Sequence, residues 1–336
     1  MEEVYPGIYL IKEKVKFESI KPSENIYIIT GNDGLIFDAG YGNKKMVKFL
    51  VRKIHEIQDY YKEIGKAFNL SRILPSHTHP DHFSGLKKIR EYLGVKIILT
   101  RQMAEVIKNK RAYSHAYDIK IEDDYFSVEK SFRHKINNWL RKFFSYLIYN
   151  RLYKISFVSD PDITIEPDST IIINGEEWNI FSSPGHSGDH ISLYNEEKGI
   201  LFSGDNVLSS ITTWLGPPNG SIERYMDSIK KIQQLPNLNL ILPAHGKPIM
   251  DPKKRIADIL EHRTERTQQI LDIITQNSGK GISPTNLLIE LYPNEGRIIH
   301  QMAKGWINLT LKMLEKEGQI RKIKNTNRFT LKEENN

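Results

Sequence analysis

The chain has 336 residues, of which 39% are hydrophobic, so it is long enough to bury a substantial core and to form two folded units. It contains no cysteine, which excludes disulfides and thiolate metal ligands and restricts any metal site to nitrogen and oxygen ligands. The formal net charge of +7 is compatible with an anionic partner such as nucleic acid, and equally with general lysine richness.

The N-terminal residues and the length of the apolar runs indicate where in the cell the protein is expected. The N-terminal residues lack the basic and then apolar pattern of a signal peptide. No apolar run approaches the roughly 20 residues that a membrane-spanning helix needs. We therefore expect a cytoplasmic protein without a transmembrane segment.

Strand-like and helix-like segments alternate through the first hundred residues, which is typical of an α/β fold. Apolar runs between turn residues predict strands, and apolar residues at helical spacing predict helices. The expected strands are 7–11, 25–30, 35–38 and 96–100, and the expected helices are 44–67 and 83–93.

Residues from about 102 to 160 interrupt this alternation and are interpreted as a helical insertion. Its central part, 132–152, has apolar residues at helical spacing, basic residues largely on the other side, and many aromatic residues. Three roles are open for this amphipathic helix: packing on the enzyme core, covering the substrate pocket, or contacting a membrane surface or nucleic acid.

The residues after about 252 are expected to form a second unit. They predict a long linker helix at 253–275, helices at 283–291 and 298–316, and a β-hairpin formed by 319–323 and 328–331. This arrangement predicts a winged-helix domain over 253–336, following a catalytic domain over 1–252. The hairpin's basic residues suit phosphate binding, whereas a packing or homodimerisation role is equally open; these residues are Arg321, Lys322, Lys324 and Arg328.

The most informative segment lies between an apolar run and the helix expected at 83–93. Within six residues it contains four side chains of the metal-binding types, namely His77, His79, Asp81 and His82. Two histidines at i and i+2 can point the same way from an extended loop, and the next two side chains can point at a neighbouring position. One short turn could therefore provide ligands to two metal ions.

Three later strand-like runs, 178–183, 199–203 and 239–243, each end in a turn that contains a metal-binding type of residue. These residues are His186, Asp205 and His245, and a glycine lies beside each of them. In layered α/β folds, ligands gather where strands end and loops begin. The sequence therefore predicts that the three residues join the first cluster in one site.

The order of these motifs resembles that of the metallo-β-lactamase superfamily, over roughly residues 5 to 250. The resemblance implies a four-layer αββα sandwich and a site with two metal ions. It implies that His77, His79 and His186 bind one metal, that Asp81, His82 and His245 bind the second, and that Asp205 bridges them. It also implies that Asp38, at the end of an early strand, supports the loop with the first ligands.

A narrower resemblance lies in residues 183–190, 202–206 and 261–270, which are similar to the glyoxalase-II-like branch of this superfamily. That branch includes β-lactamase-like endoribonucleases, in which a winged helix follows the enzyme domain. Because it also includes thioesterases, the resemblance implies the type of chemistry more closely than the substrate.

The ligand set predicts a hydrolase in which a hydroxide between two metal ions attacks an ester-like bond. The resemblance favours two zinc ions, although iron and manganese also accept these ligands. Asp81 is expected to take part in catalysis as well as in metal binding. His190 is expected either to orient a ligand or to protonate a leaving group.

Two substrate classes stay open. The positive charge and the winged helix favour single-stranded RNA, and the insertion, as a lid over a small pocket, favours a thioester. An anionic small molecule is a third candidate partner. An iron-dependent oxidoreductase and a non-catalytic nucleic-acid-binding protein are less favoured, because the hydrolase ligand set is complete.

Overall fold

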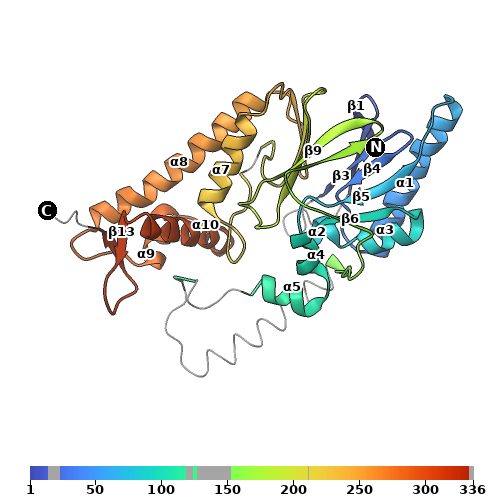
Figure 1. The fold of residues 1–336 in the computed structure, drawn as a ribbon. Coiled ribbons are helices and arrows are strands. Elements are labelled where there is room, and N and C mark those ends of the chain that lie inside the picture. The colour runs from blue at the N-terminus through green and yellow to red at the C-terminus, as the bar shows by residue number, and fades with distance from the viewer. Residues whose placement is uncertain (14–22, 119–123, 127–152, 211, 333–336) are drawn as a thin grey trace.

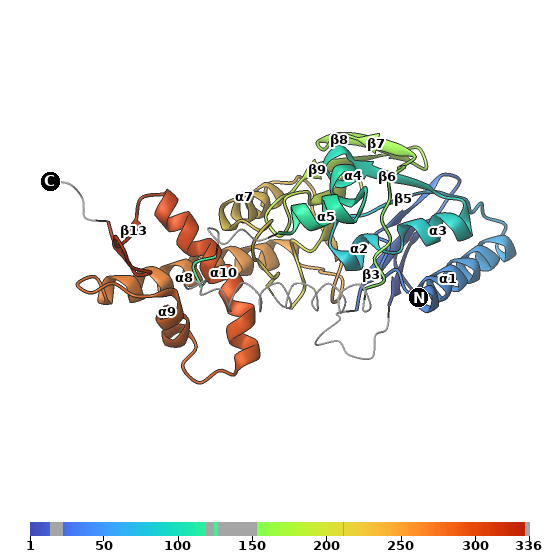
Figure 2. The ribbon, with the colours of Figure 1, turned by 90° about the horizontal axis from the view of Figure 1, so that it is seen from below.

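The computed structural model describes residues 1–13, 23–118, 124–126, 153–210 and 212–332. These residues form two β-sheets that pack against each other, with helices on the outside (Figure 1). The N-terminal sheet lies at one end of the molecule, and the C-terminal helices lie at the other end in both views (Figure 2). The structure therefore has the expected α/β fold.

The first sheet has seven strands in sequence order, β1 to β7. The pairs from β1 to β4 are antiparallel, and the pairs from β4 to β7 are parallel. The strands are β1 Glu2–Tyr5, β2 Ile8–Lys12, β3 Asn25–Ile29, β4 Gly34–Phe37, β5 Leu70–Leu74, β6 Lys96–Thr100 and β7 Ile163–Ile165. The four strands that the sequence predicts in this region are confirmed, and the structure adds β1, β5 and β7.

The second sheet has five strands in the order β12-β11-β10-β9-β8, of which β11 and β12 are parallel and the other pairs antiparallel. Its strands are β8 Ser169–Ile173, β9 Glu176–Ser182, β10 Ile191–Asn195, β11 Ile200–Gly204 and β12 Leu240–Pro243. The three predicted runs correspond to β9, β11 and β12. Each of these strands ends next to one of the predicted ligands.

Neighbouring residues of the second sheet point to opposite faces, and both faces are buried along β10, β11 and β12. Phe202 packs into the core between the sheets, with its ring centroid 5.1 Å from that of Tyr27 and 5.2 Å from that of Phe37. The adjacent Leu201 belongs to the core on the other side of the sheet, together with Ile229 of α7 (Ile222–Gln233). Helices therefore cover the outer face of this sheet.

The helix α1 (Lys44–Glu63) covers the outer face of the first sheet with a stripe of buried apolar residues. The predicted helix at 83–93 is instead divided into α2 (Pro80–Phe83) and α3 (Leu86–Leu93). The break occurs where Gly85 approaches the backbone of Ala39, because a Cβ at this position would lie 2.0 Å from the Ala39 carbonyl oxygen. This contact fixes the position of α2, which carries Asp81 and His82.

The C-terminal residues form the three helices and the hairpin that the sequence predicts. They are α8 Pro252–Gln276, α9 Pro284–Leu291, α10 Arg297–Lys316, β13 Ile320–Lys322 and β14 Phe329–Leu331. Their assignment as a winged helix stays a prediction. Residues from all three helices share one hydrophobic core with the outer face of the second sheet. The boundary at 252 likewise stays a prediction.

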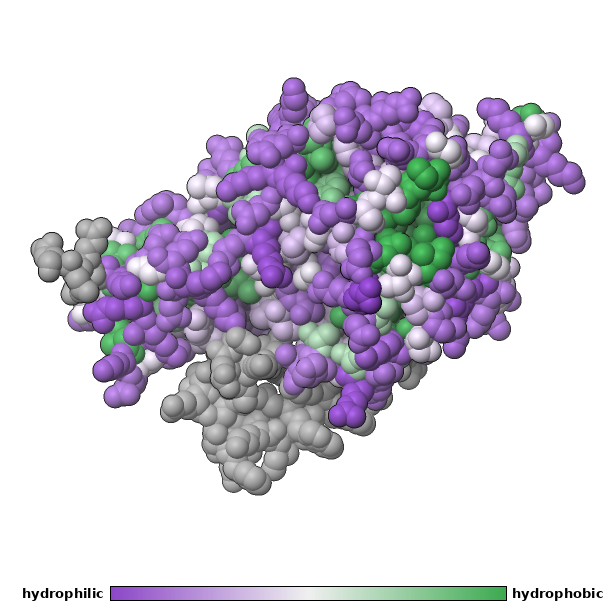
Figure 3. Space-filling view, viewed as in Figure 1, coloured by the Kyte–Doolittle hydropathy of each residue, from purple (hydrophilic) through white to green (hydrophobic). Residues whose placement is uncertain are grey.

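Within the expected insertion, the structure contains α4 (Arg101–Ile107) and α5 (Lys110–Ala116). The amphipathic helix predicted at 132–152 lies outside the described residues. Among the residues that are described, no helix combines the length and apolar character needed to cross a membrane. The face in Figure 3 is largely hydrophilic, with a hydrophobic patch on the side of the first sheet.

Candidate metal centre

The predicted ligands lie on four loops, each of which follows a strand of one of the two sheets. His77, His79, Asp81 and His82 follow β5 and enter α2, whereas His186, Asp205 and His245 follow β9, β11 and β12. Their ligand atoms form two adjacent groups. The structure thus brings together all seven side chains that the sequence predicts as ligands.

The first group contains His77, His79, His186 and Asp205, and its ligand atoms lie within 4.8 Å of one another. Nδ1 of His79 lies 2.8 Å from Nε2 of His186, which in turn lies 3.3 Å from Oδ2 of Asp205. Nε2 of His77 is buried and has no hydrogen-bond partner among the described residues. Three imidazoles and a carboxylate that converge in this way suit a zinc ion.

The second group contains Asp81, His82 and His245, together with Glu24. The Nδ1–H of His245 donates to the carbonyl oxygen of Ser23 at 2.8 Å, which turns Nε2 toward the other ligands. This Nε2 atom lies 3.3 Å from Oδ1 of Asp205 and 3.9 Å from Oδ2 of Asp81. An imidazole fixed by its second nitrogen is the usual arrangement of a metal-binding histidine.

Glu24 is the member of these groups that the sequence did not identify. It immediately precedes β3 and belongs to no ligand motif, so its only signal is an ionisable residue directly before an apolar strand. Its neighbours in the site, His82 and His245, lie far away in the sequence. The fold is therefore needed to recognise it.

Asp205 lies between the two groups. Its Oδ2 is 3.3 Å from Nε2 of His186 in the first group, and its Oδ1 is 3.3 Å from Nε2 of His245 in the second. Oδ2 is also 3.7 Å from Nε2 of His82. One carboxylate thus faces imidazoles on both sides, as a residue shared by two metal ions would.

The pKa values of the histidines are shifted in different directions in the two groups. Burial, together with the neighbouring imidazoles, holds the pKa values of His77 and His79 well below the usual range, which keeps the rings neutral and able to bind metal. Burial would also lower the pKa of His82, but the Glu24 and Asp38 carboxylates outweigh it and raise that pKa. Burial would raise the pKa of Asp205, whereas His245 and His82 hold it well below its usual value.

The residues present fit metal ions. Several buried polar atoms of both groups have no hydrogen-bond partner among the described residues, and leaving such atoms unpaired is costly. Divalent cations would satisfy imidazole nitrogens and carboxylate oxygens at once. The atoms in question are His77 Nε2, His82 Nε2, Asp205 Oδ1 and Oε2 of Glu24.

Asp38 supports the first ligand loop, as the family resemblance implies. Its Oδ1 accepts a hydrogen bond from the backbone N–H of Ser76 at 2.7 Å, and its Oδ2 lies 3.2 Å from Nδ1 of His82. Its own N–H donates to the carbonyl of Leu74 at 2.9 Å. The carboxylate therefore links the end of β4 to the loop that bears His77 and His79.

His190 lies behind the ligands and belongs to neither group. Its Nε2 accepts a hydrogen bond from the backbone N–H of Asp205 at 3.1 Å, and its Nδ1 lies 2.9 Å from Oγ of Ser183. Burial holds the pKa of this ring well below the usual range. These contacts favour the role of holding Asp205 in place over the role of a proton donor.

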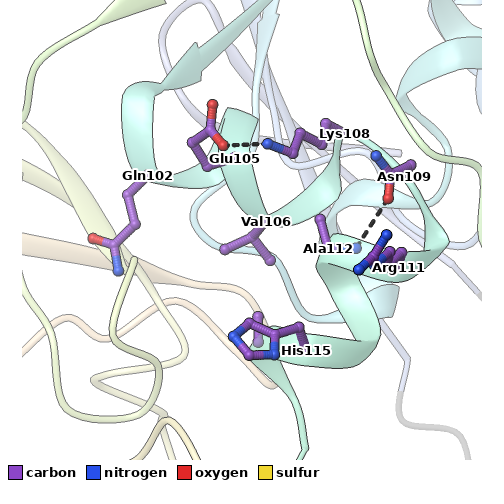
Figure 4. A pocket seen from close by; sticks show the side chains of 9 residues that line it. Gln102, Glu105, Val106, Lys108, Asn109, Arg111, Ala112 and His115 are labelled. Carbon is purple, nitrogen blue, oxygen red and sulfur yellow. Dashed lines mark hydrogen bonds and ion pairs between the residues drawn. The ribbon is translucent and has the colours of Figure 1, made fainter.

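The described part of the insertion lies close to the first group. The hydroxyl of Tyr117, at the end of α5, donates to the carbonyl of Thr78 at 3.0 Å, and its ring centroid is 5.7 Å from that of His79. A separate open pocket lies between α4 and α5 and is lined by side chains such as Gln102, Val106 and His115 (Figure 4). It contains none of the ligands, so the metal centre and not this pocket is the candidate site.

Comparisons with known proteins agree with this geometry. The family model described as Metallo-beta-lactamase superfamily matches residues 21–245. A protein called Beta-lactamase-like protein 2 homolog from Caenorhabditis elegans is 29% identical over 150 residues, which cover 45% of this chain and 48% of that protein. The protein of the same name from Drosophila melanogaster is 29% identical over 182 residues, covering 51% of this chain and 60% of that protein. The chain thus spans about half the length of these curated relatives.

Solved structures resemble nearly the whole chain. A metallo-beta-lactamase family protein from Thermus thermophilus has a TM-score of 0.71 and 19% identity, and the match covers 98% of this chain and 99% of that one. A beta-lactamase domain protein from Burkholderia ambifaria has a TM-score of 0.73 and 19% identity, with 98% and 93% covered. At this identity the likeness concerns the fold alone.

Proposed function

Because the chain belongs to the metallo-β-lactamase superfamily, we propose that it is a hydrolase that uses two metal ions to cleave an ester-like bond. The position of Asp205 carries this proposal, since its two oxygens each lie 3.3 Å from an imidazole of a different ligand group. A single ion would not need a carboxylate placed in this way. Zinc is the proposed metal, because imidazoles dominate the first group.

The predicted ligands would be shared out between the two metal ions. His77, His79 and His186 would bind the first ion, and Asp81, His82 and His245 the second, with Asp205 shared between them. When bound, the two ions would lower the pKa of a water molecule and polarise the oxygen of the bond to be cleaved. Asp81 is only partly buried, so it is also proposed to accept a proton from the attacking water.

Single-stranded RNA is the first proposed substrate. The exposed hairpin of β13 and β14 carries four basic side chains, which suit contacts with phosphates, and the chain as a whole is basic. The phosphodiester bond presents a phosphoryl oxygen of the kind that two cations stabilise. The basic residues are Arg321, Lys322, Lys324 and Arg328.

A thioester is the second candidate, and the position of Tyr117 favours it. This residue belongs to the part of the insertion that lies near the ligands, with its ring 5.7 Å from that of His79. An insertion anchored there could restrict the site to small substrates. The relevant enzymes would be of the glyoxalase-II or acyl-CoA thioesterase type.

The test is a panel of substrates offered to the zinc-loaded full chain. Cleavage of single-stranded RNA, acyl-thioesters and β-lactams would be measured in parallel, with the metal content determined for the same preparation. We expect zinc-dependent hydrolysis of RNA or of a thioester, and its loss in Asp205→Ala. Turnover that survives in Asp205→Ala, or that persists after complete metal removal, would contradict the proposal.

A matched control separates the site from general effects of changing a buried carboxylate. Glu13 is a buried glutamate that belongs to neither ligand group, with Oε2 at 3.4 Å from the backbone nitrogen of Tyr41. Glu13→Gln should therefore retain its metal and its activity.

A further inference from the structure

Glu24 is completely buried at the edge of the metal centre, where it contacts two predicted ligands. Its Oε1 lies 3.1 Å from Nδ1 of His82, and its Oε2 lies 3.4 Å from Nε2 of His245. The two contacts are not equivalent. His82 faces Glu24 with Nδ1 and Asp205 with Nε2. His245 faces both Glu24 and Asp205 with Nε2. One oxygen of Glu24 thus lies behind a ligand, and the other points at the metal position.

The surroundings of Glu24 do not otherwise stabilise a buried carboxylate. Among the described residues, no hydroxyl and no backbone N–H donates to either oxygen. Asp38, which is also buried beside His82, does receive such a bond, from the N–H of Ser76 at 2.7 Å. An ionised carboxylate without donors is expensive to bury unless a cation lies next to it.

We propose that Glu24 is an additional ligand of the second metal position, with Oε2 binding the ion while Oε1 accepts a hydrogen bond from His82. This inference rests on the proposed second metal position. It gives that position three carboxylates, Glu24, Asp81 and Asp205, and two imidazoles, His82 and His245. The first position has three imidazoles and the carboxylate of Asp205.

The additional carboxylate changes which metal ions the second position prefers. Zinc suits a four-coordinate, imidazole-rich site, whereas Mn²⁺ prefers oxygen ligands and higher coordination numbers. The two positions should therefore differ in selectivity. The first should retain zinc against Mn²⁺, and the second should accept Mn²⁺ much more readily than the first.

A purely orienting role for Glu24 makes a different prediction. If Glu24 only accepted a hydrogen bond from His82, glutamine would replace it, because its amide oxygen can accept the same bond. As a metal ligand, however, glutamine loses the negative charge that attracts the cation. Glu24→Gln thus retains the orienting function and weakens the binding function, because a neutral amide oxygen is a poorer ligand than a carboxylate.

The experiment measures metal binding and needs no substrate. Metal-free full-length chain receives one equivalent of zinc and is then titrated with Mn²⁺, and free Mn²⁺ is followed by electron paramagnetic resonance. We expect the native chain to bind one Mn²⁺, and Glu24→Gln to bind it more weakly by at least the roughly 10-fold that loss of an outer-shell partner alone costs, with the first zinc unaffected. Binding of Mn²⁺ to Glu24→Gln with the native affinity would overturn the proposal.

Cobalt provides a second readout that an orienting role would not change. The absorption of bound Co²⁺ is weaker when more ligands surround it, so the second equivalent should absorb weakly in the native chain and more strongly in Glu24→Gln. Identical spectra would also count against Glu24 as a ligand. Glu13→Gln is the matched control, and it should match the native chain in both measurements.

Two further observations distinguish a misfolded variant from the loss of a metal ligand. Retention of the first zinc by Glu24→Gln reports a folded site, and Glu24→Asp, which keeps the charge but shortens the side chain, should bind Mn²⁺ with intermediate affinity. If Glu24→Asp binds no more tightly than Glu24→Gln, charge is not what the second ion requires and the proposal fails. A chain that binds both ions but hydrolyses none of the offered substrates would contradict the proposed function and leave this inference intact.

Discussion

The carbonyl oxygen of Trp214 accepts a hydrogen bond from Nδ1 of His186 at 2.7 Å. This bond directs Nε2 of His186 toward Asp205, so the loop after residue 211 helps to position a ligand of the first metal. The same loop packs against the C-terminal helix α10. A Cβ on Gly305 would lie 2.8 Å from the carbonyl oxygen of Leu215, next to Trp214. The C-terminal region is thus in contact with the backbone that holds a ligand.

Gly305→Ala should therefore weaken metal binding from a distance. Alanine alone would stabilise the interior of a helix by about 1 kcal/mol relative to glycine. Here the added methyl group would collide with the Leu215 carbonyl, and overpacking of this kind costs about 1–3 kcal/mol. We expect a lower Tm and weaker binding of the first zinc, measured by thermal unfolding and by competition with a chelator.

The control for this variant is Gly296→Ala at the start of the same helix, where an added Cβ meets no atom within 4 Å. It should leave zinc affinity unchanged. If Gly305→Ala raises the Tm and binds zinc normally, then α10 is not coupled to His186 through this loop.

Asp205→Ala should release metal from both positions, because the carboxylate faces imidazoles of both groups. Elemental analysis of the native chain should give close to two metal ions per chain, and the variant should retain less than one. A variant that keeps one tightly bound ion at full occupancy would show that Asp205 serves a single position.

The sequence predicted most of this site because its signals are local. His77 to His82 concentrate four ligand types in one turn, and His186, Asp205 and His245 each follow an apolar run that ends at a glycine-containing turn. Glu24 could not be found in this way, because its neighbours His82 and His245 are distant in sequence and no motif marks it. The same limit explains the break between α2 and α3, which depends on the contact of Gly85 with Ala39.

Asp38 can be tested with two variants that both remove its negative charge. Asp38→Asn can still accept the hydrogen bond from the N–H of Ser76, and asparagine tolerates the positive φ of 65° at this position. Asp38→Ala loses this acceptor and leaves a buried N–H unpaired, which costs about 1–3 kcal/mol. Chemical unfolding should show a larger loss of stability for alanine than for asparagine. Equal losses would mean that the charge facing His82 is what the loop requires, and that neither the bond to Ser76 nor the positive φ contributes measurably.

The two roles predicted for His190 can be separated by metal content and by the leaving group. Its Nε2 accepts the N–H of Asp205 at 3.1 Å, and burial holds its pKa well below the usual range, so at neutral pH the ring carries no proton on the nitrogen that faces the site. We therefore expect His190→Ala to lose metal, and added zinc to restore part of its activity. A proton donor would give the opposite pattern, with full metal content and a loss of kcat that disappears for substrates whose leaving group needs no protonation. Measuring zinc content and kcat for a good and a poor leaving group in the same variant decides between them. Full metal content combined with a leaving-group-dependent loss would make His190 the acid and would leave the backbone of Asp205 to be held by other contacts.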